Sequence, residues 1–141
     1  MKKTKLLIDY DFGFILIGIT TTSKDYKLAW ILNKRLQFNL SRQSDLHLPF
    51  EKGQDLTLSH YLFTTDFIQV HLVKNKSVAD SDATAFLIPE LNHFDYFLKI
   101  EEEGEQIQLP ELLQTLRSVE HIQLVQQIDI NKLKSKENLI F

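Results

Sequence analysis

The chain has 141 residues, of which 43% are hydrophobic and 25% charged, a balance typical of a compact globular domain. Its formal net charge is -3, from 16 basic and 19 acidic residues, which argues against binding to nucleic acid or an anionic membrane through overall charge. It contains no cysteine, which excludes disulfide bonds, thiolate metal sites and cysteine nucleophiles. We therefore expect a single domain over residues 1–141.

The first residues, Met-Lys-Lys, begin like a signal peptide. Asp9 and Asp11 interrupt the apolar run that follows, however, and no small-residue cleavage site comes after it. No apolar run in the sequence approaches the roughly 18 residues that a membrane-spanning helix needs. These features predict a cytoplasmic protein without a membrane segment.

A long apolar run over residues 5–20 predicts a central strand, because both alternating sets of side chains are apolar in its second half. Gly18 in this strand indicates the close approach of a neighbour. A helix is expected next, with Ser23 as its N-cap and an end near Leu36. Its predicted apolar face combines the following side chains: Tyr26, Leu28, Ala29, Trp30, Ile31, Leu32 and Leu36.

Three antiparallel strands are predicted over residues 42–50, 55–63 and 67–74, and the apolar pattern decides how they pair. A three-residue loop ending at Gly53 sets leucines of the first two strands opposite each other. A similar loop over residues 64–66 sets apolar residues of the second and third strands opposite each other. A shift by one residue would instead place these leucines against Ser, Thr and Gln. The predicted pairs are Leu48 with Leu56, Leu46 with Leu58, Leu62 with Ile68, and Leu58 with Leu72.

The second half of the chain continues with a polar loop over residues 74–83, expected to be mobile, and a strand over residues 94–101. A helix follows in which Pro110 is the first residue, and alternating apolar residues from Ile122 to Ile130 predict the last strand. The order of elements predicts an α+β fold, a mainly antiparallel β-sheet with two helices packed on one face. A ferredoxin-like elaboration is one arrangement of this kind.

The predicted register places Asp45, Ser59 and His71 in one row across three strands, which superficially resembles a catalytic triad. A triad needs the histidine between the serine and the carboxylate, whereas here the serine would lie in the middle. We interpret the row as a hydrogen-bonded sheet surface. The same register directs His60 into the apolar face with no second histidine beside it, which favours a core histidine over a metal ligand.

Four carboxylates, those of Asp9, Asp11, Glu90 and Asp95, are candidates for a ligand site if their strands are neighbours, together with Tyr96. Carboxylates that cluster can bind a hard cation or perform acid-base chemistry. The sequence contains no metal-binding loop, phosphate-cradling loop or nucleophile elbow, so we predict no metal site, no cofactor and no catalytic residue. For Glu90 the favoured role is structural, since its carboxylate can accept bonds from unpaired backbone N–H groups.

The end of the chain combines a short basic run over residues 131–136 with three large apolar residues, Leu139, Ile140 and Phe141. Three lysines without interleaved aromatic residues favour a solvated segment over a phosphate-contacting arm, which again argues against nucleic acid. The apolar residues would be a liability if exposed, so they are expected to pack on this chain or on a partner.

The segment Ile88-Pro89-Glu90, followed after three residues by Phe94-Asp95-Tyr96, resembles the signature of the IPExxxVDY family of small bacterial proteins. Phe94 stands where the signature has valine, and the resemblance extends over essentially the whole chain. This resemblance implies no activity, cofactor or catalytic residue, because the family is uncharacterised. Pro89 itself predicts the end of a strand, since proline cannot donate a ladder hydrogen bond.

Two functional hypotheses follow from the sequence. The first is a non-enzymatic cytoplasmic protein-interaction module or homodimer, with Leu139, Ile140 and Phe141 as candidate partner-binding residues. The alternative is a small-ligand-binding or regulatory domain, with a cleft near Asp9, Asp11, Glu90 and Tyr96. An enzyme without a recognisable motif ranks third.

Overall fold

The computed structural model describes residues 13–49, 55–77, 85–103 and 107–141. The two α-helices are α1 (Asp25–Leu36) and α2 (Leu109–Arg117). The main sheet contains β1 (Ile15–Thr21), β2 (Ser41–Arg42), β5 (His60–Thr64), β6 (Ile68–Lys74), β7 (Tyr96–Glu102) and β8 (Ile122–Gln127). A separate two-stranded sheet contains β3 (Leu46–Pro49) and β4 (Asp55–Leu58), and the 3₁₀-helices are η2 (Pro89–Leu91), η3 (Ile130–Lys132) and η4 (Lys136–Leu139).

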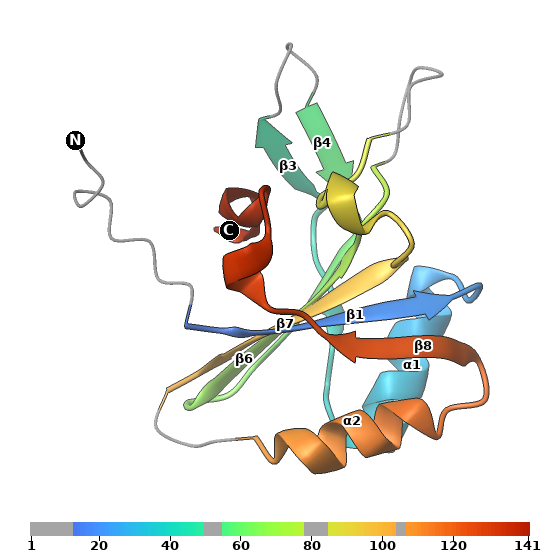
Figure 1. Cartoon of the computed structure of the whole chain (residues 1–141). Helices are drawn as coiled ribbons and strands as arrows, with labels where there is room; N and C mark the ends of the chain where they lie inside the picture. The colour runs from blue at the N-terminus through green and yellow to red at the C-terminus, as the bar shows by residue number, and fades with distance from the viewer. Residues whose placement is uncertain (1–12, 50–54, 78–84, 104–106) are drawn as a thin grey trace.

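The strands of the main sheet lie in the order β2-β5-β6-β7-β1-β8, and each neighbouring pair is antiparallel. In chain order, α1 follows β1, and α2 connects β7 to β8. The four strands β8-β1-β7-β6 and the two helices thus have the ferredoxin-like arrangement, with β5 and β2 added beside β6. Both helices cover the same face of the sheet (Figure 1), so the predicted α+β fold is confirmed.

The helix-covered face holds one hydrophobic core, in which α1 and α2 pack on β1, β6 and β7. The buried side chains of α1 are Leu28, Ala29, Ile31 and Leu32, as predicted. The prediction for Tyr26 and Trp30 is wrong, since their side chains are 64% and 59% exposed. Helical geometry explains the difference, because these two residues lie four apart on the side of α1 that faces away from the sheet.

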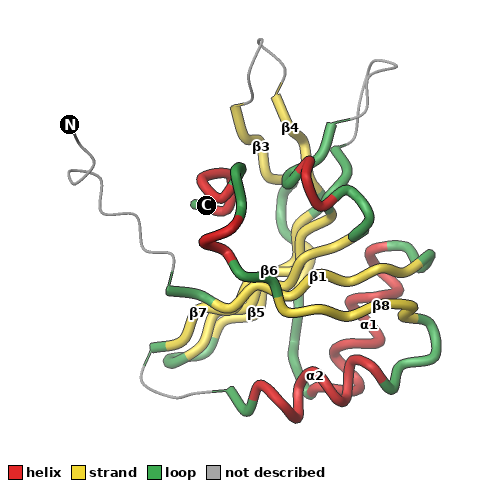
Figure 2. Tube along the Cα trace, viewed as in Figure 1, coloured by secondary structure: helices red, strands yellow, loops and turns green. Residues whose placement is uncertain are grey.

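The other face of the sheet, called the outer face below, is covered by the end of the chain and by the β3–β4 hairpin (Figures 1 and 2). Ile128, Ile130, Leu133 and Leu139 are buried there in a second hydrophobic core. Phe141 also packs against this core. Leu139 and Phe141, two of the three apolar residues at the end of the chain, therefore have intramolecular contacts. No helix in the described part of the chain is long and apolar enough to cross a membrane.

The first predicted hairpin register is confirmed, with Leu46 opposite Leu58 and Leu48 opposite Leu56. The second is wrong, because Leu62 lies opposite His71 and not opposite Ile68. The strand predicted over residues 55–63 is divided at Ser59 into β4 and β5, which belong to different sheets. This division removes the predicted row of Asp45, Ser59 and His71.

The segment between β6 and β7 is fastened by Asn75, whose side chain is fully buried although sequence places it in a polar loop. Its amide donates to the carbonyls of Leu91 (3.1 Å) and Phe94 (2.9 Å) and accepts from the N–H of Ile88 (3.0 Å). As predicted, strand pairing does not continue through Pro89, which begins η2. Of the predicted mobile loop, residues 78–83 lie outside the described residues.

Candidate ligand-binding site

A pocket of 450 Å³ lies where β1, β6 and β7 meet the start of α1. This volume is within the range of small-molecule sites, roughly 300 to 1,000 Å³. Three lysines from two segments line it: Lys24 at the N-cap of α1, and Lys74 and Lys76 at and just beyond the end of β6. The chain returns to this pocket at Phe86, which is half-buried and forms an isolated antiparallel β-bridge with Lys76.

The floor of the pocket is held in place by hydrogen bonds between the β1–α1 loop and β7. The N–H of Thr21 donates to Oδ2 of Asp95 (2.9 Å), and the hydroxyl of Tyr96 donates to the carbonyl of Ser23 (2.9 Å). The hydroxyl of Thr20 donates to the carbonyl of His93 (2.9 Å). These bonds fix the loop that carries Lys24 relative to the sheet.

The charge balance of the pocket is positive. Lys24 and Lys76 are exposed and Lys74 is partly exposed, and the ion pairs recorded among the described residues involve other cations. Asp95 is the carboxylate among the lining residues, and one of its oxygens already accepts the bond from Thr21. Asp25, just outside the pocket, offsets part of the charge of Lys74, but three ammonium groups still outnumber the two carboxylates and favour a negatively charged occupant.

Asp25 lies beside the pocket, in the first turn of α1, and its carboxylate is already occupied. Its Oδ2 accepts from the Ser59 hydroxyl (2.5 Å), and its Oδ1 accepts from the N–H of Tyr26 (2.9 Å). Burial opposes ionisation of Asp25, but these hydrogen bonds, together with the positive charges of Arg42 and Lys74, hold its pKa below the ordinary value. Burial, together with Asp25 and Asp95, raises the pKa of Tyr96, so its hydroxyl remains a donor at neutral pH.

The structure brings together some of the residues that sequence singled out. Asp95 and Tyr96 both line the pocket, whereas Glu90 does not. Glu90 instead accepts from the backbone N–H groups of Lys134 (2.6 Å) and Ser135 (2.9 Å), in agreement with the predicted structural role of its carboxylate. Asp9 and Asp11 lie outside the described residues.

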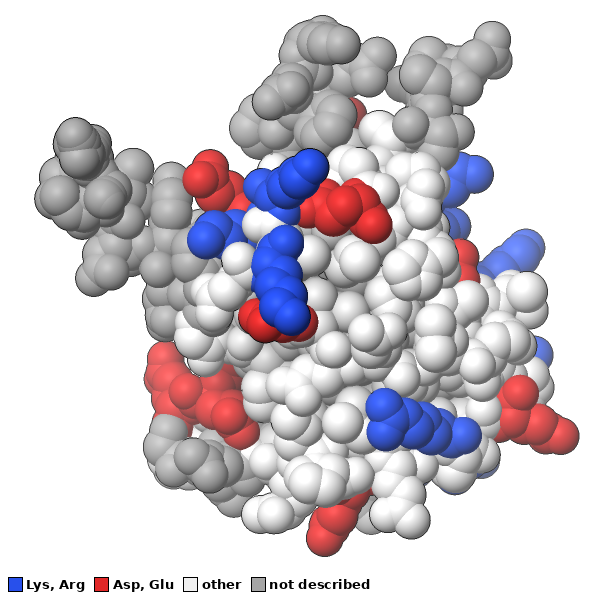
Figure 3. All heavy atoms as spheres, in the orientation of Figure 1, with Lys and Arg blue, Asp and Glu red and all other residues white. Residues whose placement is uncertain are grey.

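The three residues predicted for partner binding differ in how exposed they are to solvent. Leu139 is fully buried, Phe141 is partly buried, and Ile140 is 37% exposed. On the face seen in Figure 3, basic and acidic side chains lie close together over the end of the chain, so this face presents no extended basic surface.

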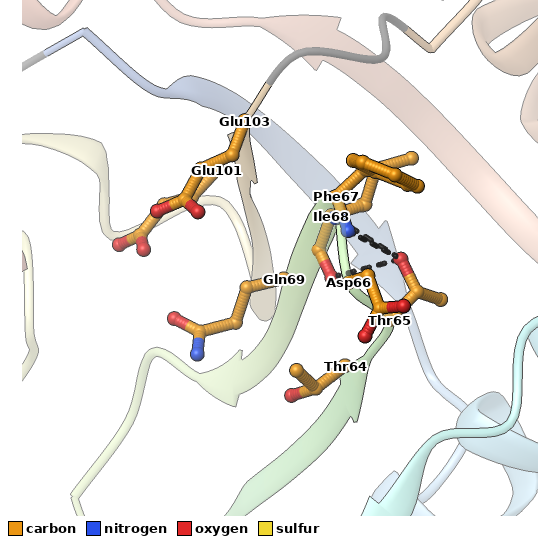
Figure 4. Close-up of a pocket in the computed structure, with 8 residues that line it drawn as sticks. All are labelled: Thr64, Thr65, Asp66, Phe67, Ile68, Gln69, Glu101 and Glu103. Carbon is orange, nitrogen blue, oxygen red and sulfur yellow. Dashed lines mark hydrogen bonds between the residues drawn. The ribbon is translucent and has the colours of Figure 1, made fainter.

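A second, smaller hollow of 110 Å³ lies at the β5–β6 turn (Figure 4). Its lining includes Asp66, Glu101 and Glu103, while Thr65 closes the turn by accepting from the N–H of Ile68 (3.0 Å). Among the described residues, no three Asp, Glu, His or Cys side chains are placed to hold a metal ion. The hollow is therefore a weaker candidate than the pocket at α1.

Sequence reasoning missed the three lysines as a group. Lys24 precedes α1, whereas Lys74 and Lys76 follow β6, and the fold brings these two distant segments together. The available signal was the series Thr20-Thr21-Thr22-Ser23-Lys24, a run of hydroxyl residues between a buried strand and a helix. Such a junction places polar groups at one end of a sheet, where ligands commonly bind.

Comparison with known proteins gives no matching family model and no matching curated protein. The resemblance to the IPExxxVDY family stays a prediction, and the function proposed below is inferred from the geometry of the pocket.

Proposed function

We propose that the protein is a cytoplasmic binding module that takes a small, multiply charged anion in the pocket at the start of α1. The observation that supports this proposal is the convergence of Lys24, Lys74 and Lys76 on one cavity of 450 Å³. The proposal modifies the second of the two sequence hypotheses, since Asp95 and Tyr96 line the pocket while Glu90 lies elsewhere.

The chemistry of the pocket favours a ligand with at least two negative charges. Ammonium groups held near one another repel, and an anion between them relieves that repulsion. The positive end of the α1 dipole adds a small preference for negative charge, although the N–H of Tyr26 is already bonded to Asp25. A phosphate or a di- or tricarboxylate satisfies these requirements better than a monocarboxylate does.

The ligand also meets an apolar wall. Phe86, which is partly exposed, and Tyr96, which is nearly buried, both line the pocket. A ligand that combines a charged end with a flat or apolar portion would cover Phe86 while its anionic group contacts the lysines. The pocket therefore favours a phosphorylated or carboxylated metabolite over a bare inorganic ion.

A thermal-denaturation screen tests this proposal with inorganic phosphate, pyrophosphate, citrate and a set of sugar phosphates and mononucleotides. A ligand at 100 times its Kd stabilises the folded state by about 2.7 kcal/mol, which raises Tm by several degrees in a domain of this size. Lys24→Gln, Lys74→Gln and Lys76→Gln should each weaken binding by roughly fivefold, the effect of about 1 kcal/mol for a partly exposed charge pair.

The matched control is Lys27→Gln, since Lys27 is exposed on the same helix but does not line the pocket. Binding that survives the triple Lys→Gln variant unchanged would place the ligand elsewhere. If no compound in the screen raises Tm, small-anion binding is contradicted.

A second candidate function, homodimer formation, is favoured by the edge strand β8. This strand carries no charged residue, and its Leu124 is 41% exposed. The N–H of Ile128 bonds to Leu16 in β1, so by the alternation of an antiparallel ladder the N–H of Gln127 points away from β1. The carbonyl of Val125, the next outward residue, already accepts from the Arg117 guanidinium (3.2 Å), so pairing with β8 of a second copy would involve the Gln127 end of this edge.

Light scattering coupled to gel filtration tests the homodimer. Gln127→Pro removes one outward donor from an exposed residue, and Gln127→Ala is the control that keeps it. The dimer predicts twice the 16.5 kDa chain mass for wild type and Gln127→Ala, with a shift towards monomer for Gln127→Pro. A monomeric wild type at high concentration would contradict it.

A further inference from the structure

Three ionisable side chains are buried together on the outer face of the sheet. His60 on β5 is 7% exposed, His71 on β6 is 5% exposed, and Lys99 on β7 is 2% exposed. Ionisable groups are seldom buried to this extent unless each has a partner. The surrounding groups must therefore provide a hydrogen-bonding or charged partner for each of the three side chains.

The two imidazoles form a directed chain of hydrogen bonds. Nε2 of His71 lies 3.0 Å from Oε1 of Gln69, which can only accept, so His71 carries its proton on Nε2. Nδ1 of His71 is then an acceptor, and Nε2 of His60, 2.8 Å away, donates to it. The rings stack with their centroids 5.1 Å apart. With these donors and acceptors both histidines are neutral; a second proton on His71, at Nδ1, could bond to His60 only if His60 moved its own proton from Nε2 to Nδ1.

The end of the chain covers this pair. The ring of Phe141 meets His71 edge-on with centroids 5.3 Å apart and His60 with centroids 6.2 Å apart. Nζ of Lys99 lies 4.3 Å from the centre of the Phe141 ring and donates to the backbone oxygen of Phe141 (3.3 Å). Leu139, two residues earlier, is fully buried in the outer-face core.

The charged groups around the pair are mostly positive. Lys99 on β7 faces it, and Arg42 on β2 adds a second cation near His60. The negative charge of Glu101 is held by Lys99 at 3.0 Å, and that of Asp45 by Arg42 at 2.6 Å. Burial, with these neighbours, lowers the pKa of His60 and lowers that of His71 to about 4.

We propose that segment 138–141 is an acid-sensitive latch, which closes over the neutral His60–His71 pair and opens when the pair binds a proton. A proton on either ring adds a cation beside Lys99 and Arg42 under an apolar cover, and on His71 it also breaks the bond from His60. Opening gives water access to the charged ring and exposes the His60–His71–Lys99 surface. This inference does not depend on the anion-binding proposal, which involves a different set of residues at the start of α1.

The magnitude of the effect follows from linkage. If opening returned the pKa of His71 from about 4 to 6.5, closure would weaken by roughly 20-fold between pH 7 and pH 5; this is the upper limit, because His60 and Lys99 stay beside His71 in the open state. Burial opposes ionisation of Glu90, which fastens the chain at Ser135, but its hydrogen bonds hold its pKa below the ordinary value, so acidification acts on the histidines before it acts on Glu90. Opening of the segment between pH 7 and pH 5 can therefore be attributed to protonation of the histidines and not to protonation of Glu90.

Hydrogen exchange followed by NMR, corrected for the pH dependence of intrinsic exchange, tests the latch. The N–H groups of Asn138 and Ile140, which bond to the carbonyls of Ser135 and Glu137, should lose protection by up to about that factor from pH 7 to pH 5. The amides of β1 and β7 should keep theirs. His60→Gln combined with His71→Gln removes the titration and should abolish the pH dependence, whereas His121→Gln, at an exposed histidine, should retain it.

Equal loss of protection in the double variant would overturn the proposal, as would parallel loss throughout the sheet, which indicates global unfolding. A second measurement applies even if the double variant does not fold. Phe141→Ala opens the cover permanently, so by reciprocity the pKa values of His60 and His71, measured from their NMR titrations, should rise towards 6.5. Unchanged pKa values in Phe141→Ala would contradict the latch.

Discussion

The side-chain oxygen of Asn75 accepts a hydrogen bond from the backbone N–H of Ile88 at 3.0 Å, in the interior of the protein. The same side chain donates to Leu91 and Phe94, so one amide satisfies three buried or partly buried backbone groups of the segment between β6 and β7. Asn75 therefore explains why the segment around Pro89 has a fixed path without strand pairing.

We expect Asn75→Ala to lower the free energy of unfolding by about 3 kcal/mol, because it leaves these backbone groups without partners. Urea denaturation measures the loss. Asn33→Ala is a control at a half-buried asparagine, whose side chain bonds only to the backbone of Leu40. A loss for Asn75→Ala no larger than for Asn33→Ala would show that water replaces the missing bonds.

Gly18 is the point of closest approach between β1 and the aromatic ring of Phe94. A Cβ atom at this position would lie 2.7 Å from atoms of the ring, which confirms the predicted close neighbour. Phe94 is 1% exposed and has little room to move. We expect Gly18→Ala to destabilise the protein by roughly 2–3 kcal/mol. In the Phe94→Leu background, Gly18→Ala should lower the free energy of unfolding by less than it does in the wild type. Additive losses in this double-mutant cycle would rule out the clash.

Glu90 fastens the end of the chain to η2 through two backbone N–H groups and the hydroxyl of Ser135. Glu90→Gln keeps one acceptor oxygen but loses the charge, so we expect a loss of about 1–2 kcal/mol in urea denaturation. Exposed Glu120, with no such bonds, provides Glu120→Gln as a control with an effect near zero. Equal effects of the two substitutions would show that solvent screens the bonds of Glu90.

The buried histidines also predict how global stability depends on pH. Their pKa values are lowered on folding, so the unfolded state binds more protons below pH 6.5 and stability falls as the pH is lowered. For His71 the loss is spread between pH 6.5 and about pH 4 and reaches about 3 kcal/mol. Urea denaturation at half-unit pH intervals measures it. Stability that is constant from pH 7 to pH 5 would be inconsistent with two neutral, buried rings.

The fold was predictable where one face of an element is apolar and the turn has a strong local signal. The β3–β4 pairing follows from alternating leucines and the glycine of its loop, and the stripe of α1 follows from residues such as Leu28 and Leu32. The β5–β6 pairing was not predictable in this way. A buried strand accepted polar side chains because they bond to one another, so apolar matching selected the wrong register for His71.

The candidate site was predictable only in part for a similar reason. Asp95 and Tyr96 were singled out because they follow a distinctive proline turn, and both line the pocket. Lys24, Lys74 and Lys76 carry no local signal, since lysines on a surface are common in any soluble protein. The order of the strands is what brings Lys24 to the neighbouring Lys74 and Lys76.

The most direct test of anion binding is an NMR titration of the 15N-labelled protein with pyrophosphate at constant ionic strength and at pH 7. The proposal predicts saturable shifts concentrated in the amides of Thr22, Ser23, Lys24 and Lys76, which are reduced in Lys24→Gln combined with Lys74→Gln and retained in Lys27→Gln. Shifts that do not saturate, or that spread over lysines remote from the pocket, would contradict a specific anion site at the start of α1.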